Sequence, residues 1–134
     1  MSTVSIRAAL ETGLNSMTPA LSTAWENVPF TTPTSAYQVA HLMFAQPDNA
    51  TIGHDYHQEI GMLQVDLMYP ENTGSAAAYT RAELIRDTFY RGATFTAGGV
   101  SVIIERTPEI MPGTNDGGRY ILPVRIRFFA GIFN

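Results

Sequence analysis

The stretch QEIGMLQVDLMYPENTGSAAAYTRAELIRDTFYR, from Gln58 to Arg91, decides the fold. Its first part alternates apolar and polar side chains, and a period of two predicts a strand with one buried face. Pro70 to Gly74 then ends the strand, because proline removes a backbone donor while asparagine and glycine accept turn dihedrals. The apolar positions of the predicted strand are Leu63, Val65, Leu67 and Tyr69.

A helix is predicted directly after this turn. Ser75 can cap its first turn, and Gly92 can stop it. Its apolar side chains recur at helical spacing, at Ala78, Ala82, Ile85 and Phe89. Strand, turn and helix together form one apolar layer, which the remaining segments cover or extend.

Three elements are predicted on the N-terminal side of this layer. A helix covers Val4 to Met17, and a short extended piece covers Ala24 to Phe30 and carries Trp25 as a core anchor. A strand follows over Tyr37 to Gln46. Because this strand is apolar at both parities, we expect both of its faces to be covered.

On the C-terminal side, Thr94 to Glu105 is predicted to form a tight hairpin around Gly98 and Gly99. Thr107 to Gly118 is a long loop, and long loops in compact domains are usually functional or disordered. The last strand, Tyr120 to Phe129, belongs beside the strand that opens the central stretch. There, Asp66 and Glu59 are expected to face Arg125 and Arg127.

This order of elements predicts an α+β fold. We expect a mainly antiparallel sheet of four to six strands with two helices packed on one face. A length of 134 residues predicts one domain, spanning residues 1–134.

Composition restricts the classes of function. Charged residues make up only 15% of the chain, which favours a surface rich in neutral polar groups together with partial burial by another subunit. A net charge of -4 disfavours binding to nucleic acid through its phosphates. The chain has no cysteine, and no stretch long and apolar enough for a membrane span. We expect it to be made in the cytosol, where it stays unless it leaves within a larger particle.

No catalytic, cofactor-binding or metal-binding residues are predicted. His54 and His57 form the one cluster with a metal-ligating character, but no third ligand stands at a recognisable spacing. Two other classes of function stay open. One is a small hydrolase or metal enzyme that uses these residues and His41, and the other is a ligand-binding module with Trp25 and Tyr37 lining an apolar pocket.

Eight short segments spread over nearly the whole chain share one pattern: Ile6 to Glu11, Ala24 to Asn27, Gly61 to Pro70, Arg81 to Ile85, Phe89 to Gly92, Gly98 to Val100, Gly118 to Tyr120 and Pro123 to Ile126. Together they resemble the small tail-terminator and tail-completion proteins of long-tailed bacteriophages. The resemblance implies an α+β subunit without catalytic residues or a cofactor. It also implies a homohexameric ring at the head-proximal end of the tail tube. A head-to-tail adaptor or another neck protein is the related alternative.

The resemblance implies partners as well: further copies of the chain, the tail tube protein and the head-tail connector proteins. DNA is expected to pass through the lumen without specific binding, and the protein is expected in the virion after assembly in the host cytoplasm. We expect the axial contact at Glu109, Ile110, Met111, Asn115, Asp116 and Arg119, because Ile110 and Met111 have no obvious core to enter. The lateral contact is expected at Glu59, Asp66, Arg125 and Arg127.

Overall fold

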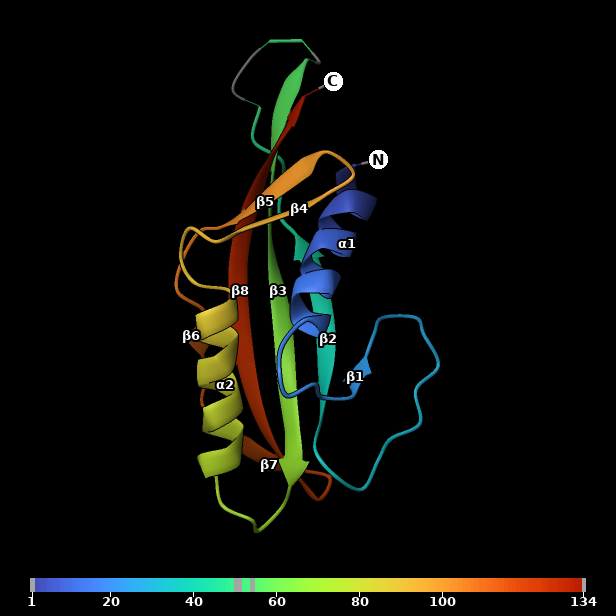
Figure 1. The fold of residues 1–134 in the computed structure, drawn as a ribbon, viewed down its shortest axis with the longest axis vertical. Helices are drawn as coiled ribbons and strands as arrows, with labels where there is room; N and C mark the ends of the chain where they lie inside the picture. Colours follow the sequence, from blue (N-terminus) through green and yellow to red (C-terminus); the bar gives the residue numbers. More distant parts are fainter. Residues whose placement is uncertain (1, 50–51, 54, 134) are drawn as a thin grey trace.

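The fold is that of a computed structural model, which describes residues 2–49, 52–53 and 55–133 (Figure 1). Two helices and eight strands follow one another along the chain. In order, they are α1 (Ser2–Asn15), β1 (Thr23–Ala24), β2 (Tyr37–Phe44), β3 (Tyr56–Pro70), α2 (Ala76–Thr88), β4 (Thr94–Ala97), β5 (Val100–Ile104), β6 (Glu109–Ile110), β7 (Thr114–Asp116) and β8 (Arg119–Phe133).

All the strands belong to one sheet. Its main path runs β1-β2-β3-β8-β5-β4, and β6 and β7 pair separately with β8. Every pairing is antiparallel except that of β1 with β2. The predicted α+β class and mainly antiparallel sheet are therefore confirmed. The main path has six strands, and the total reaches eight because two short segments of the 107–118 loop pair with β8.

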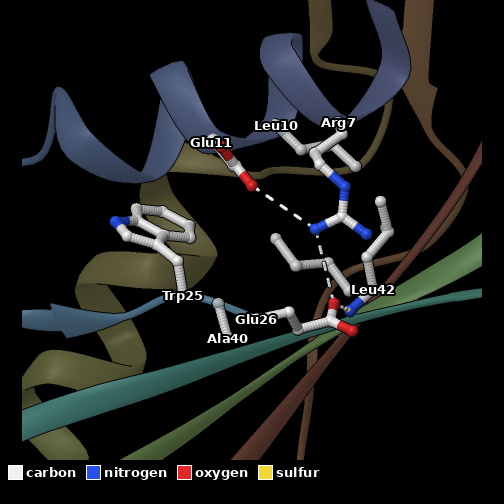
Figure 2. A pocket seen from close by; sticks show the side chains of 8 residues that line it. Arg7, Leu10, Glu11, Trp25, Glu26, Ala40 and Leu42 are labelled. Carbon is white, nitrogen blue, oxygen red and sulfur yellow. Dashed lines mark hydrogen bonds and ion pairs between the residues drawn. The ribbon is translucent and has the colours of Figure 1, made fainter. Parts of the chain in front are cut away.

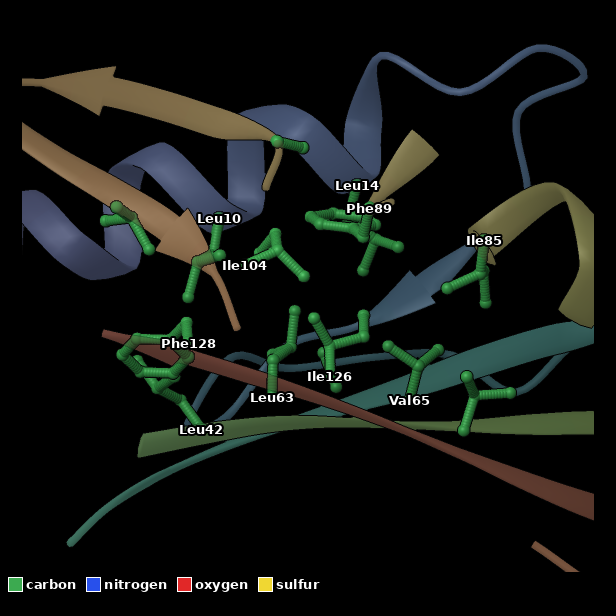
Figure 3. Close-up of a cluster of buried hydrophobic side chains, with 14 of the residues drawn as sticks. Leu10, Leu14, Leu42, Leu63, Val65, Ile85, Phe89, Ile104, Ile126 and Phe128 are labelled. Atoms are coloured by element: carbon green, nitrogen blue, oxygen red, sulfur yellow. The ribbon is translucent and has the colours of Figure 1, made fainter. Parts of the chain in front are cut away.

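Strands β3 and β8 form the centre of the sheet. They pair at every position, from Tyr56 opposite Phe133 to Pro70 opposite Arg119. The alternation predicted for both strands is confirmed, since every second side chain is buried. The buried side chains of the two strands include Leu63, Val65, Leu67, Leu122, Val124, Ile126 and Phe128 (Figure 3).

Both helices cover the same face of this central pair (Figure 1). Helix α2 packs on β3 and β8, and its predicted apolar stripe is buried at Ala78, Ala82, Ile85 and Phe89. Helix α1 packs against the hairpin β4-β5, which folds back over it. The turn of that hairpin is Gly98-Gly99, with φ of +56° and +77°. Two consecutive positive φ values match the turn that suits the twist of a hairpin, as predicted.

Three local predictions are wrong. Ser75 stands before α2, but its side chain makes no capping hydrogen bond. The piece predicted over Ala24 to Phe30 is extended only at Thr23–Ala24, because a turn with Asn27 at φ +56° follows. Strand β2 is covered on one face only: Ala40 and Leu42 are buried, whereas Met43 is 41% exposed.

Glu26 occupies the outer edge of β2 (Figure 2). Strand β1 pairs only with Gln38 and Val39, so the outer edge of β2 beyond them has no neighbouring strand in the described part of the chain. Glu26 Oε1 accepts a hydrogen bond from the backbone N–H of Leu42 at 2.7 Å and lies 3.4 Å from Arg7 Nη1. A side chain thus takes the place of a strand on this edge.

Candidate functional site

In the described part of the chain, no helix covers the face of the sheet opposite α1 and α2. We call this surface, formed by the outward side chains of β2, β3 and β8, the bare face. The register aligns the outward residues of the three strands in rows. The apolar residues among them are half-buried or exposed, and they include Val39, Met43, Ile60, Met62, Met68, Ile121 and Phe129. Where β2 ends, beside Phe44, there is a hollow of about 220 Å³. It is lined by Met43, Phe44, Ala45, Ile60, Gly61, Met62 and Arg127.

A chain of polar contacts crosses the bare face. Gln64 is paired with Arg125 on one side and with His41 on the other. Arg125 Nε donates to Gln64 Oε1 at 3.2 Å, and Gln64 Nε2 donates to Asp66 Oδ1 at 2.9 Å. His41 Nε2 lies 3.7 Å from Asp66 Oδ2. Asp66 and Arg125 therefore share this face, as predicted, but Gln64 links them in place of a direct ion pair.

The expectation that Glu59 faces the arginines is wrong. Glu59 pairs with Ala130, and it lies an even number of positions from Leu63, so its side chain is on the helix-covered side. It is 7% exposed, and its Oε1 lies 3.3 Å from His57 Nε2. Of the four residues predicted for the lateral contact, only Asp66, Arg125 and Arg127 share the bare face.

The 107–118 loop also differs from its prediction. Ile110 pairs with Val124 and packs against the core, because β6 lies along the outer edge of β8. The expectation that it has no core to enter is wrong. Met111 is half-buried, and its backbone N–H donates to Pro123 O at 2.9 Å. Asn115 and Asp116 are exposed in β7, near the turn that leads into β8.

Arg119 has an internal role that the sequence did not indicate. Its Nη1 donates to Ser35 O at 2.7 Å, and its Nη2 donates to Pro33 O. Its guanidinium also lies 5.0 Å from the centre of the Tyr37 ring. Arg119 thus connects the loop before β2 to the beginning of β8. The N–H groups that make these hydrogen bonds are not available to an external partner.

Arg81 is a buried charged residue that sequence reasoning missed. It is 5% exposed, its Nη1 donates to Pro19 O, and its Nε and Nη2 have no partner in the described part of the chain. Burial lowers the pKa of its guanidinium, because desolvation disfavours the charged form. One signal could have found it: position 81 falls on the same helical stripe as Ala78, Ala82 and Ile85.

Neither alternative class of site is assembled in the described residues. His41 lies on the bare face and His57 on the opposite one, and His54 falls outside the described residues. No group of three or more potential metal-ligating side chains occurs among the described residues. Trp25 lines a hollow of only about 10 Å³ together with Leu10, Ala40 and other residues, roughly the room of one water (Figure 2). Tyr37 is not among its lining residues and instead contacts Phe30.

A family model described as phage tail terminator protein matches residues 5–128. The chain belongs to the phage tail terminator family. This terminator chain is therefore a structural protein of a phage tail, and the expected family is confirmed. In the described residues, neither helix of the terminator has the length and apolarity needed to cross a membrane.

One solved structure is similar to the terminator chain over its full length. The two share 27% sequence identity with a TM-score of 0.81, and the match covers 100% of this chain and 99% of the other. That protein carries no functional name, so the similarity supports the fold and adds no activity. The comparison with curated proteins finds no match.

Proposed function

We propose that the terminator assembles as a ring of six copies at the head-proximal end of a phage tail tube. There it stops tube growth and forms the surface that joins the head connector. Assembly takes place in the host cytoplasm, and the ring remains in the virion. In this role the protein binds the tail tube and the head connector, and it does not act as an enzyme.

The ring proposal is supported by the apolar side chains of the bare face. An antiparallel sheet with one face in water normally alternates apolar and polar side chains. Here many outward side chains of the three central strands are apolar, and they include Met43, Met62 and Met68. Apolar side chains gathered on one exposed face usually mark an interaction surface. The low share of charged residues, 15%, fits a subunit whose surface is partly covered.

The polar chain on this face would set the alignment of neighbouring copies. Asp66, Arg125 and Arg127 offer charges within an otherwise apolar surface, and polar groups in such surfaces favour one register over others. We propose these three residues for the lateral contact. Glu59 is left out, because its side chain lies on the helix-covered side.

The axial contacts are proposed at the ends of the long strands. Asn115 and Asp116 are exposed at the end of the subunit where β3 also turns towards α2 (Figure 1). Two turns there offer accessible side chains to a neighbouring ring. Ile110 and Arg119 are occupied by internal packing and hydrogen bonds, so we assign them no axial role. The net charge of -4 fits DNA that passes without being bound.

Native mass spectrometry over a range of protein concentrations tests the ring. We expect a species of ring size in the wild type, either alone at high concentration or after addition of tail tube protein. The double variant Met62→Glu/Ile121→Glu should remain monomeric, because each added carboxylate would be buried without a partner in the contact. Val28→Glu is the matched control, since Val28 is 54% exposed in the turn after β1.

Circular dichroism must show that all the variants are folded. A wild type that stays monomeric with tube protein at every concentration would overturn the ring. A double variant with the same mass distribution as the wild type would move the lateral contact away from the bare face. Retention by connector protein but not by tube protein would favour a head-to-tail adaptor.

A further inference from the structure

Five of the eight arginines gather around one segment of the subunit. Two hollows of about 410 and 580 Å³ meet at Arg106 and Thr107, beside the segment that connects β5 to β6. Three carboxylates lie in or beside them, those of Glu83, Glu105 and Glu109, so the cluster is positive in a chain of net charge -4. We call this surface the arginine groove, and its arginines are Arg86, Arg91, Arg106, Arg125 and Arg127.

Most of the donor capacity of these arginines is unused. Each guanidinium has five N–H donors. Arg86 Nε donates to Pro108 O at 2.9 Å, and Arg106 Nε lies 3.6 Å from Glu105. The side chains of Arg91 and Arg127 have no hydrogen bond or ion pair with other described residues. The groove therefore presents several cationic donors to whatever enters it.

The floor of the groove is held in place by the fold. The backbone N–H of Glu105 donates to Arg127 O at 2.9 Å, and Pro108 is buried. Arg86 lines the groove from α2, and Arg125 and Arg127 line it from β8. Because three separate elements fix the positions of the charges, little ordering is needed when a ligand binds.

The lining favours carboxylates over other ligands. The forked guanidinium matches a carboxylate in a bidentate geometry. Each of the two hollows, of about 410 and 580 Å³, is far larger than a single ion. Among the described residues no aromatic side chain lines them, so these residues offer no platform for nucleic-acid bases. Glu105 and Glu109 would repel the anionic groups of any ligand, but a peptide, unlike a phosphate backbone, can also donate its own N–H groups to them.

We propose that the arginine groove binds an acidic segment of a neighbouring protein, with the aspartates or glutamates of that segment paired to Arg91 and Arg106. The assignment of that neighbour to the tail rests on the proposed function. The preference of the groove for a carboxylate-rich peptide does not, and it can be measured on the isolated chain.

Fluorescence anisotropy with a labelled peptide of alternating glutamate and serine tests the groove. We expect binding at low ionic strength that weakens as salt is added. The double variant Arg91→Gln/Arg106→Gln should lose about tenfold in affinity, because it removes two charge-assisted contacts from exposed positions. Glu105→Gln/Glu109→Gln should bind the peptide more tightly, since it removes like charges from the groove. Arg7→Gln, in α1 beside Glu26 and outside the groove, is the control and should bind as the wild type does.

Absence of peptide binding at low ionic strength would overturn the proposal, as would equal affinity of the Arg91→Gln/Arg106→Gln variant. Tighter binding of labelled duplex DNA, lost in the same variant, would assign the groove to nucleic acid and also overturn it. Native mass spectrometry of this variant separates the groove from the ring. A ring of normal size with lost peptide binding supports both proposals independently.

Discussion

Gly61 allows two aromatic rings to meet across the central strand. The register places Phe44, Gly61 and Phe128 side by side on three adjacent strands. The two rings contact edge to face, with centroids 6.1 Å apart. A Cβ atom at position 61 would lie 2.5 Å from Met43 O and 2.6 Å from Phe128 Cζ. Backbone and ring therefore leave no room for a side chain.

Replacing Gly61 with alanine tests this packing. Because a backbone oxygen cannot move away without disturbing the ladder, Gly61→Ala should lower the free energy of unfolding by about 2 kcal/mol. Gly131→Ala is the matched change on β8, where the nearest atoms belong to the Tyr56 ring at 3.1 Å, which can shift. Urea denaturation measures both variants. Equal losses would show that the crowding at Gly61 is not specific.

At the same scale, the sequence held more information about Glu59 than the prediction used. Glu59 has the same parity as Leu63 and Val65, so the period of two already placed it on the buried side. Arg81 was predictable in the same way from its place on the helical stripe. For Glu59, charge suggested pairing with the arginines, and local geometry overruled it.

Among the elements, the outer edge of β2 depends on a single carboxylate. Glu26 accepts the N–H of Leu42, which no neighbouring strand does. Open edges of this kind invite pairing with other chains. We expect Glu26→Ala to lower the free energy of unfolding by about 1–2 kcal/mol, because a charge-assisted hydrogen bond is lost. Urea denaturation should show the loss, and light scattering should show slow growth of large aggregates.

Glu11→Ala is the control for this edge. It also removes a carboxylate from Arg7, at 3.5 Å, but it leaves the Leu42 N–H bonded. Exposed pairs at this spacing contribute only about 0.3–0.5 kcal/mol, so the protein should remain stable and monodisperse. Matching behaviour of the two variants would mean that the carboxylate at Glu26 does not protect the edge.

The elements that could be predicted are those with a long, regular pattern. Strands β3 and β8 alternate over many residues, and the stripe from Ala78 to Phe89 repeats at helical spacing. Strands β6 and β7 could not be predicted, because two or three residues carry no period and their pairing depends on the distant β8. The prediction that both faces of β2 are covered failed for another reason. Apolar residues such as Met43 suggested a second covered face, but that face is exposed in the described part of the subunit.

For the whole molecule, we propose that residues 1–134 unfold as one unit. The core is continuous from α1 to β8, and Trp25 packs against it near α1 and β2. Small domains with one core usually unfold in a single transition. Tryptophan fluorescence and far-ultraviolet circular dichroism should therefore give the same urea midpoint, measured at concentrations where the protein is monomeric. A separate fluorescence transition would show that the segment around Trp25 detaches first.

The unbroken pairing of β3 with β8 has a mechanical consequence. Each strand has fifteen residues, so at about 3.3 Å per residue the paired strands are about 50 Å long. One end carries the turns beside Pro70 and Arg119, and the other carries Tyr56 and Phe133. Because the pairing is unbroken, a small tilt at one end of the pair moves the other end by a larger distance. A contact near Pro70 and Arg119 would thus displace the end that carries Tyr56 and Phe133, with no change in the fold between them.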